Sequence, residues 1–176
     1  DDALDAPRNR RLGVLASVIE DRLRLKIREG LGGAYSPQAA NSGSDTFPGF
    51  GYLLVQIGVD PAQAPTILAA VREIAETLRT GGITEDELQR AKQPILTQIV
   101  ESTRTNPYWL GAVLSACREQ PQRLDWARTR TSDVTAITRE EIDAFAAKYL
   151  RPERLVSYVV LPEPMPAAPG VPAPAK

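Results

Sequence analysis

The sequence predicts an α+β fold in which several helices pack on a largely antiparallel sheet. An amphipathic helical pattern comes first, two strand-like segments joined by a loop follow, and several helical segments precede a final apolar run. Two strands joined only by a loop favour antiparallel pairing. Helices that are grouped apart from the strands are typical of α+β proteins. With 176 residues, the chain is long enough for one domain with its own core.

The first helix is predicted over residues 10–30. Its apolar residues recur at steps of three and four along one stripe, formed by Leu12, Leu15, Ile19, Leu23 and Ile27. Glycines at positions 30, 32 and 33 supply the expected stop.

Three segments have strand character. Residues 34–40, "AYSPQAA", are predicted to be extended, and residues 50–60, "FGYLLVQIGVD", form the clearest strand because they partly alternate and are rich in aromatic and branched residues. Residues 41–49 between them are predicted to be loop. The run "RLVSYVVLP" at 154–162 is consistent with a strand buried on both faces or in mid-sheet.

Local start signals predict the other helices. Asp60 can cap a helix that starts with a proline and runs to the break "TGGI" at 80–83. Thr84 and Glu87 form a capping box, as do Thr138 and Glu141, and each predicts a helix. The helix after the first box is expected to run to about residue 104 and to bend at its internal proline, at position 94. Further helices are predicted after residue 107 and near residue 124.

The two ends of the chain differ from the middle. The chain opens on "DDALDAPRNRRLG" without an initiator methionine, so we expect a processed product or a piece of a longer polypeptide. We expect residues 1–163 to form the domain. Residues 164–176 are rich in proline and alanine, which predicts an extended tail or linker.

Composition excludes several classes of function. The net charge of −1 gives no reason to expect nucleic-acid binding, and no apolar run is long enough to cross a bilayer. Without histidine the chain lacks the usual neutral-pH base and the commonest metal ligand. The single cysteine, Cys117, cannot form an internal disulfide or a cysteine zinc cluster and is expected to be a buried helical residue. The glycines of "GLGGAYS" follow a helix instead of opening one, so a phosphate loop is not expected.

Arg28 and Tyr35 are the candidate functional pair. Arginine offers a fixed fork of donors and tyrosine a phenolic donor. If both point into one space around the glycine-containing bend, they could hold a peptide carbonyl, and the phenol could stabilise an oxyanion. On spacing alone, it remains open whether Arg28 instead caps helix carbonyls while Tyr35 is a core residue.

A resemblance favours the functional interpretation. The segment "LASVIEDRLRLKIREGLGGAYSPQA" resembles the signature of the C-terminal domain of the insulinase/pitrilysin (M16) zinc metallopeptidases. The similarity continues through "GFGYLLVQIGVDP", "GGITEDELQRAKQPIL" and "YLRPERLVSYVVLPE", and so spans residues 10–163. The sequence around these glycines is most similar to that of the large bacterial members, which are periplasmic or envelope-associated.

The resemblance implies a divided active site and the α+β fold of the M16 and LuxS-like domains. In that family an N-terminal domain carries zinc on a His-x-x-Glu-His motif, and the C-terminal domain supplies an arginine and a tyrosine that match Arg28 and Tyr35. This chain would then bind peptide substrates but hold no cofactor itself, with Zn²⁺ in a partner domain or subunit. A non-catalytic assembly domain of the same family is the alternative.

The resemblance also implies a strand before the first helix. Residues 1–9 have no strand-like pattern, so either the chain begins just inside the domain and leaves an open sheet edge, or another chain completes that edge. Because an unpaired edge can pair with another chain, self-association through it is a hypothesis.

Overall fold

The computed structural model describes residues 5–31, 36–44, 47 and 49–161. The elements in chain order are α1 (Ala6–Leu31), β1 (Gln38–Gly43), β2 (Gly51–Gln56), the 3₁₀ turn η1 (Pro61–Gln63), α2 (Ala64–Gly81), α3 (Glu85–Ser102), the π-helical segment η2 (Tyr108–Leu114), α4 (Gln122–Ala136), α5 (Arg139–Tyr149) and the 3₁₀ turn η3 (Pro152–Arg154). The predicted α+β class is confirmed.

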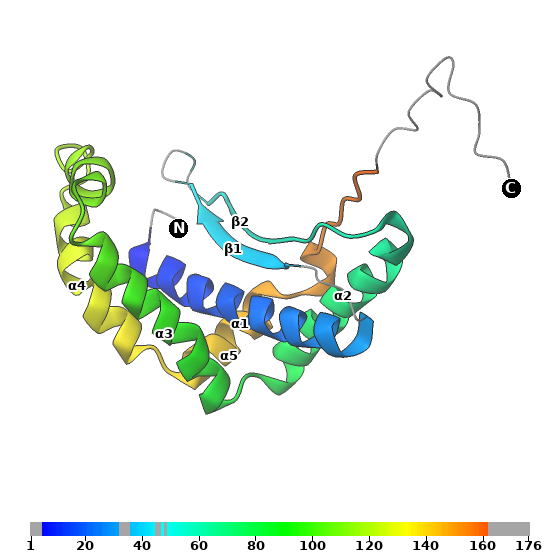
Figure 1. Ribbon diagram of the computed structural model, residues 1–176. Helices are drawn as coiled ribbons and strands as arrows, with labels where there is room; N and C mark the ends of the chain where they lie inside the picture. Colours follow the sequence, from blue (N-terminus) through cyan, green and yellow to red (C-terminus); the bar gives the residue numbers. More distant parts are fainter. Residues whose placement is uncertain (1–4, 32–35, 45–46, 48, 162–176) are drawn as a thin grey trace, which may run out of the picture.

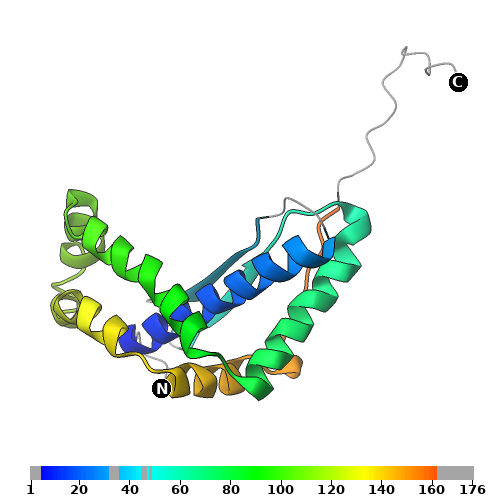
Figure 2. The same cartoon turned by 60° about the horizontal axis from the view of Figure 1, so that its bottom comes forward.

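Helix α1 is the centre of the molecule. It lies between the β1–β2 hairpin and the other helices, as the two views show (Figure 1, Figure 2). Its predicted apolar stripe is confirmed, because Leu15 and Leu23 are completely buried and Ile27 nearly so. The core therefore sits around α1, where α2, α3 and α5 meet it.

The hairpin is antiparallel, as predicted, with a register that runs from Gln38 opposite Gln56 to Gly43 opposite Gly51. Its strands differ from the predicted ranges. β1 includes residues 41–43, which were expected to be loop, and β2 ends at residue 56 instead of 60. The bounds of the two strands are set together, because each strand extends only as far as the other supplies hydrogen-bond partners.

The helix starts are largely as predicted. Both capping boxes are formed, at Thr84 with Glu87 and at Thr138 with Glu141. Asp60 accepts a hydrogen bond from the amide of Ala62 at 2.9 Å, although it caps a 3₁₀ turn and α2 begins only at residue 64. Helix α3 continues through its internal proline. The helix predicted after residue 107 is a π-helix. This form is rare in proteins overall, and where it occurs it is often at a functional site.

Two predictions are wrong. Residues 155–161, predicted to be a buried strand, have no regular secondary structure, and the exposed fractions of Tyr158 and Val160 are 88% and 93%. Apolar composition does not make a strand without a neighbour, and among the described residues the only ladder joins β1 to β2. Cys117 lies in a turn after η2 and is only partly buried.

Charged side chains fix α1 to its neighbours. The guanidinium of Arg22 donates from Nε to Glu87 Oε1 at 2.7 Å and from Nη2 to the carbonyl of Gly82 at 2.9 Å, which joins α1 to the start of α3. The hydrogen bond from Arg22 lowers the pKa of Glu87 to about 2. This contact therefore stabilises the fold most when the carboxylate is charged.

We predict that Glu87→Gln removes part of the acid sensitivity of the fold. A lowered folded pKa gives stability that is present above the unfolded value, near 4.5, and is lost as the pH falls towards about 2. At neutral pH the loss should be about 1–2 kcal/mol after allowance for solvent screening. Glutamine can still serve the capping box. Urea unfolding at pH 7 and pH 3 measures this, and equal differences between the two proteins at both pH values would contradict it.

Candidate functional site

Arg28 lies where the candidate site was predicted, in the last turn of α1, and its side chain is exposed. Its neighbour Ile27 is buried, so the helix directs residue 28 away from the core. Within the described part of the chain, the guanidinium of Arg28 has no hydrogen-bond or ion-pair partner. The alternative in which Arg28 caps helix carbonyls is therefore not found among these residues.

Strand β1 returns along α1 from that end. The amide of Ala39 donates to Glu20 Oε2 at 3.1 Å, and Asn41 Nδ2 lies 3.4 Å from the carbonyl of Asn9. Later residues of β1 thus lie beside earlier residues of α1. The two contacts fix the direction in which β1 runs along α1. The start of β1, which Ser36 precedes, therefore lies towards the end of α1 that carries Arg28.

Tyr35 lies outside the described residues. The structure therefore describes one member of the predicted pair, and the shared cavity of Arg28 and Tyr35 stays a prediction.

Among the residues that the structure covers, no group of three or more acidic, histidine or cysteine side chains could hold a metal ion. The side chains that the structure describes thus do not form a zinc site. In the same described ranges, no helix has both the length and the apolar character that a membrane crossing requires.

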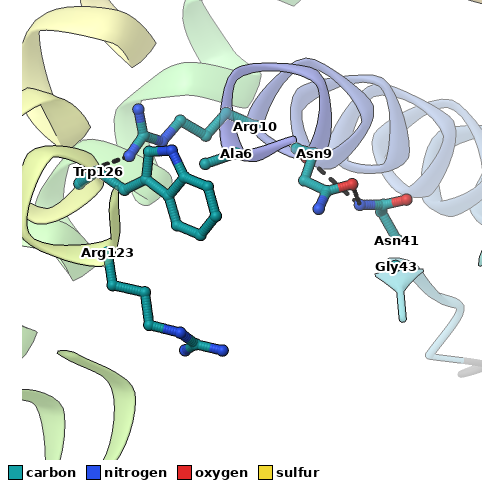
Figure 3. A pocket seen from close by; sticks show the side chains of 7 residues that line it. All are labelled: Ala6, Asn9, Arg10, Asn41, Gly43, Arg123 and Trp126. Atoms are coloured by element: carbon teal, nitrogen blue, oxygen red, sulfur yellow. Dashed lines mark hydrogen bonds between the residues drawn. The ribbon is translucent and has the colours of Figure 1, made fainter. Parts of the chain in front are cut away.

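A hollow of about 560 Å³ lies at the other end of α1 (Figure 3). The side chains that surround it come from the start of α1, the end of β1 and the start of α4, and are those of Ala6, Asn9, Arg10, Asn41, Gly43, Arg123 and Trp126. Arg10 and Arg28 are 18 positions apart, and at about 1.5 Å per residue the hollow is roughly 27 Å from Arg28. It is a separate site.

The sequence alone did not point to Glu20 or to the residues that line the hollow. In the sequence, Glu20 is one of the polar residues opposite the apolar stripe of α1. Only the position of β1 shows that its carboxylate accepts a hydrogen bond from the strand. Arg123 and Trp126 lie more than 100 residues from Asn9 in the chain. No local pattern connects them, so no signal in a single sequence could have found the hollow.

Comparison with known proteins identifies relatives of this chain. Residues 2–95, more than half of the chain, match the family described as the Peptidase M16 inactive domain. Arg28 and Tyr35 both fall within this match. The stromal processing peptidases of chloroplasts from Pisum sativum and from Oryza sativa subsp. indica are each 29% identical over 100 residues, which is 57% of this chain. The match spans only 8% of the length of those relatives.

Two solved structures share the fold. The periplasmic protease PqqL from Escherichia coli superposes with a TM-score of 0.66 at 20% identity, over 84% of this chain and 16% of PqqL. A candidate zinc protease from Bordetella pertussis Tohama I superposes with a TM-score of 0.57 at 17% identity, over 86% of both chains. At such low sequence identity, the similarity to these two structures shows a shared fold and nothing more.

Proposed function

Because the chain belongs to the Peptidase M16 inactive domain family, we propose that it is the substrate-binding, transition-state-stabilising domain of a zinc metalloendopeptidase. The observation that carries the proposal is Arg28, an exposed guanidinium at the end of α1 without a partner in the described part of the chain. A charged fork that none of the described groups of this chain uses is available to a ligand.

The proposed chemistry of this chain is limited to holding and stabilising. Arg28 donates hydrogen bonds to a carbonyl of the bound peptide, which fixes the peptide backbone beside the reacting bond. Tyr35 donates its phenolic proton in a hydrogen bond to the oxygen that becomes negative during hydrolysis. A partner domain with a His-x-x-Glu-His motif supplies Zn²⁺, which acts there as a Lewis acid and lowers the pKa of bound water.

In this proposal, the chain alone does not hydrolyse peptides. The first test is therefore to assay peptide hydrolysis with the zinc-bearing domain alone, with this chain alone and with both together. Activity only in the mixture supports the proposal. Equal activity of the zinc-bearing domain without this chain contradicts it and leaves the assembly-domain alternative. The coding sequence around that of this chain provides a further check, since the enzyme requires a His-x-x-Glu-His motif there or in a neighbouring gene.

We predict that Arg28→Lys in the assembled enzyme raises KM or lowers kcat so that kcat/KM falls about tenfold. Lysine keeps the charge but its ammonium cannot reproduce the planar fork of donors. Arg24→Lys is the matched control, because Arg24 lies one turn earlier on α1 and pairs with Asp21. Unchanged kinetics for Arg28→Lys, or an equal loss for both variants, would remove Arg28 from the proposed site.

We propose that isolated copies of this chain self-associate through the open sheet edge, and the exposed apolar run 155–161, which is not part of the sheet, offers a further surface for self-association. Val156, Tyr158 and Val160 are all more than two thirds exposed, which is unfavourable for apolar side chains in water. We predict a mass by light scattering that rises with concentration, and a shift towards monomer for Tyr158→Lys. A constant monomer mass at the highest soluble concentration would contradict this.

The likeness to PqqL also supports a place in the periplasm or the cell envelope, because PqqL is described as a periplasmic protease.

A further inference from the structure

The two strands of the hairpin direct half of their backbone groups outward. The amide of Ser44 donates to the carbonyl of Phe50 at 2.9 Å, so these residues form a hydrogen-bonded pair at the end of the ladder. Along an antiparallel ladder, such pairs alternate with pairs whose N–H and C=O groups point away from the partner strand. In the register of this hairpin, the backbone groups of Leu53 and Val55 therefore point away from β1.

The two edges of the sheet differ in what covers them. On β1, the strand nearer to α1, the outward amide of Ala39 donates to Glu20 Oε2 of the helix at 3.1 Å (Figure 1). On β2, the outward groups of Leu53 and Val55 have no hydrogen-bond partner in the described part of the chain. The open edge of the sheet is thus the outer edge of β2.

The run 155–161 has the properties of a strand that lacks a neighbour. Among the residues that the structure covers, the backbone groups of residues 156–161 have no backbone hydrogen-bond partner. Apart from Ser157, its side chains are apolar, and those of Tyr158 and Val160 are almost fully exposed. Figure 1 shows the run, in orange to red, leaving the body of the molecule beyond the end of the sheet.

The β2 edge and the run match each other in length and chemistry. β2 has six residues, about as many as the run, and neither segment contains a charged residue or a proline. Edge strands are usually protected from pairing by charges, prolines or a covering element, and both segments lack these. More than half of the run consists of valine and tyrosine, which favour strands.

We propose that two copies of this chain exchange the run 155–161, so that the run of each copy pairs as a new strand with the β2 edge of the other. This strand exchange supplies hydrogen-bond partners to the outward groups of β2 and removes apolar side chains of the run from water. Because each copy donates one strand and accepts one, the dimer closes with twofold symmetry. The inference rests on the self-association proposed above and identifies the two surfaces that meet in it.

Variants of the full chain separate the two surfaces. In the edge variant, Val55→Pro removes an outward amide of β2 and no hydrogen bond to β1. Leu54→Lys is a second edge variant, which keeps the backbone of β2 and places a charge beside the edge. In the run variant, Tyr158→Pro and Val159→Pro are combined, because one of two neighbouring amides faces the β2 edge whichever side the run presents.

Sedimentation equilibrium measures the dimer Kd of each chain and of a 1:1 mixture of the edge variant and the run variant. We expect each variant alone to raise Kd at least tenfold. In the mixture, the intact run of one chain can pair with the intact edge of the other, so Kd should be at least threefold lower than for either variant alone. If the edge variant alone dimerises as strongly as the unchanged chain, runs pair with runs. If the run variant alone does so, edges pair with edges. Either result overturns the strand exchange and leaves the self-association standing.

Amide hydrogen exchange, followed by NMR, locates the pairing. In the dimer of the unchanged chain, the amides of Leu53 and Val55 should exchange at least tenfold more slowly than in the monomer at low concentration. The amide of Leu54, which faces β1, should be protected in both states. Protection of Leu53 and Val55 in the monomer would show that the run pairs within its own chain and would overturn the strand exchange. A chain that stays monomeric at every concentration would overturn the self-association itself.

Discussion

Replacing Tyr35 with phenylalanine lowers kcat of the enzyme assembled with its zinc-bearing domain at least tenfold. The loss of one oxyanion donor typically removes about 2.7–4 kcal/mol of transition-state stabilisation. Phenylalanine keeps the ring and its packing, so the fold and the zinc content should not change. Rates of peptide hydrolysis at saturating substrate, with metal analysis of the same samples, measure the effect.

The matched control for this variant is Tyr52→Phe. Tyr52 is on β2, is about half exposed and also loses only its hydroxyl. Its kcat should equal that of the unchanged enzyme. If Tyr35→Phe also keeps full activity, Tyr35 belongs to the packing of the domain and the proposed role is wrong.

Replacing Lys92 with methionine destabilises the fold by about 2–3 kcal/mol. Lys92 in α3 is only 6% exposed, and its Nζ donates to the carbonyls of Thr135, at 2.6 Å, and Ile137, at 3.0 Å. These carbonyls belong to the end of α4, where helix carbonyls lack partners within the helix. Each hydrogen bond to a charged donor contributes about 1.5–3 kcal/mol, while the cost of burying the ammonium offsets part of the sum.

The free energy of unfolding in urea measures this loss. Lys148→Met is the matched control, because Lys148 is exposed and its Nζ lies 5.1 Å from the centre of the Tyr149 ring. Its effect should stay below about 1 kcal/mol. A midpoint for Lys92→Met that equals that of the unchanged chain would mean that Lys92 does not support the end of α4.

Features set by neighbouring residues could be predicted from the sequence. The stripe of α1 and the two capping boxes depend on residues three or four positions apart, which a single sequence displays. The run 155–161 has the composition of a buried strand, but a strand requires a partner edge elsewhere in space. Its strand prediction failed because composition does not specify that partner.

The candidate sites divide in the same way. Arg28 could be found because the glycine-rich end of α1 and the family resemblance both mark its position. The contact between Glu20 and Ala39 could not, because it depends on how β1 returns along α1. The hollow joins residues from α1, β1 and α4, and only the packing of the three elements brings them together.

A double-mutant cycle on the assembled enzyme tests the central claim most directly, namely that Arg28 and Tyr35 act on one bound peptide in a shared site. kcat/KM is measured for the unchanged enzyme, Arg28→Lys, Tyr35→Phe and the double variant. If the placement of the peptide by Arg28 is needed for the contact that Tyr35 makes, the double variant loses clearly less than the product of the two single losses. Strictly multiplicative losses would show that the two residues act independently and would contradict a shared site.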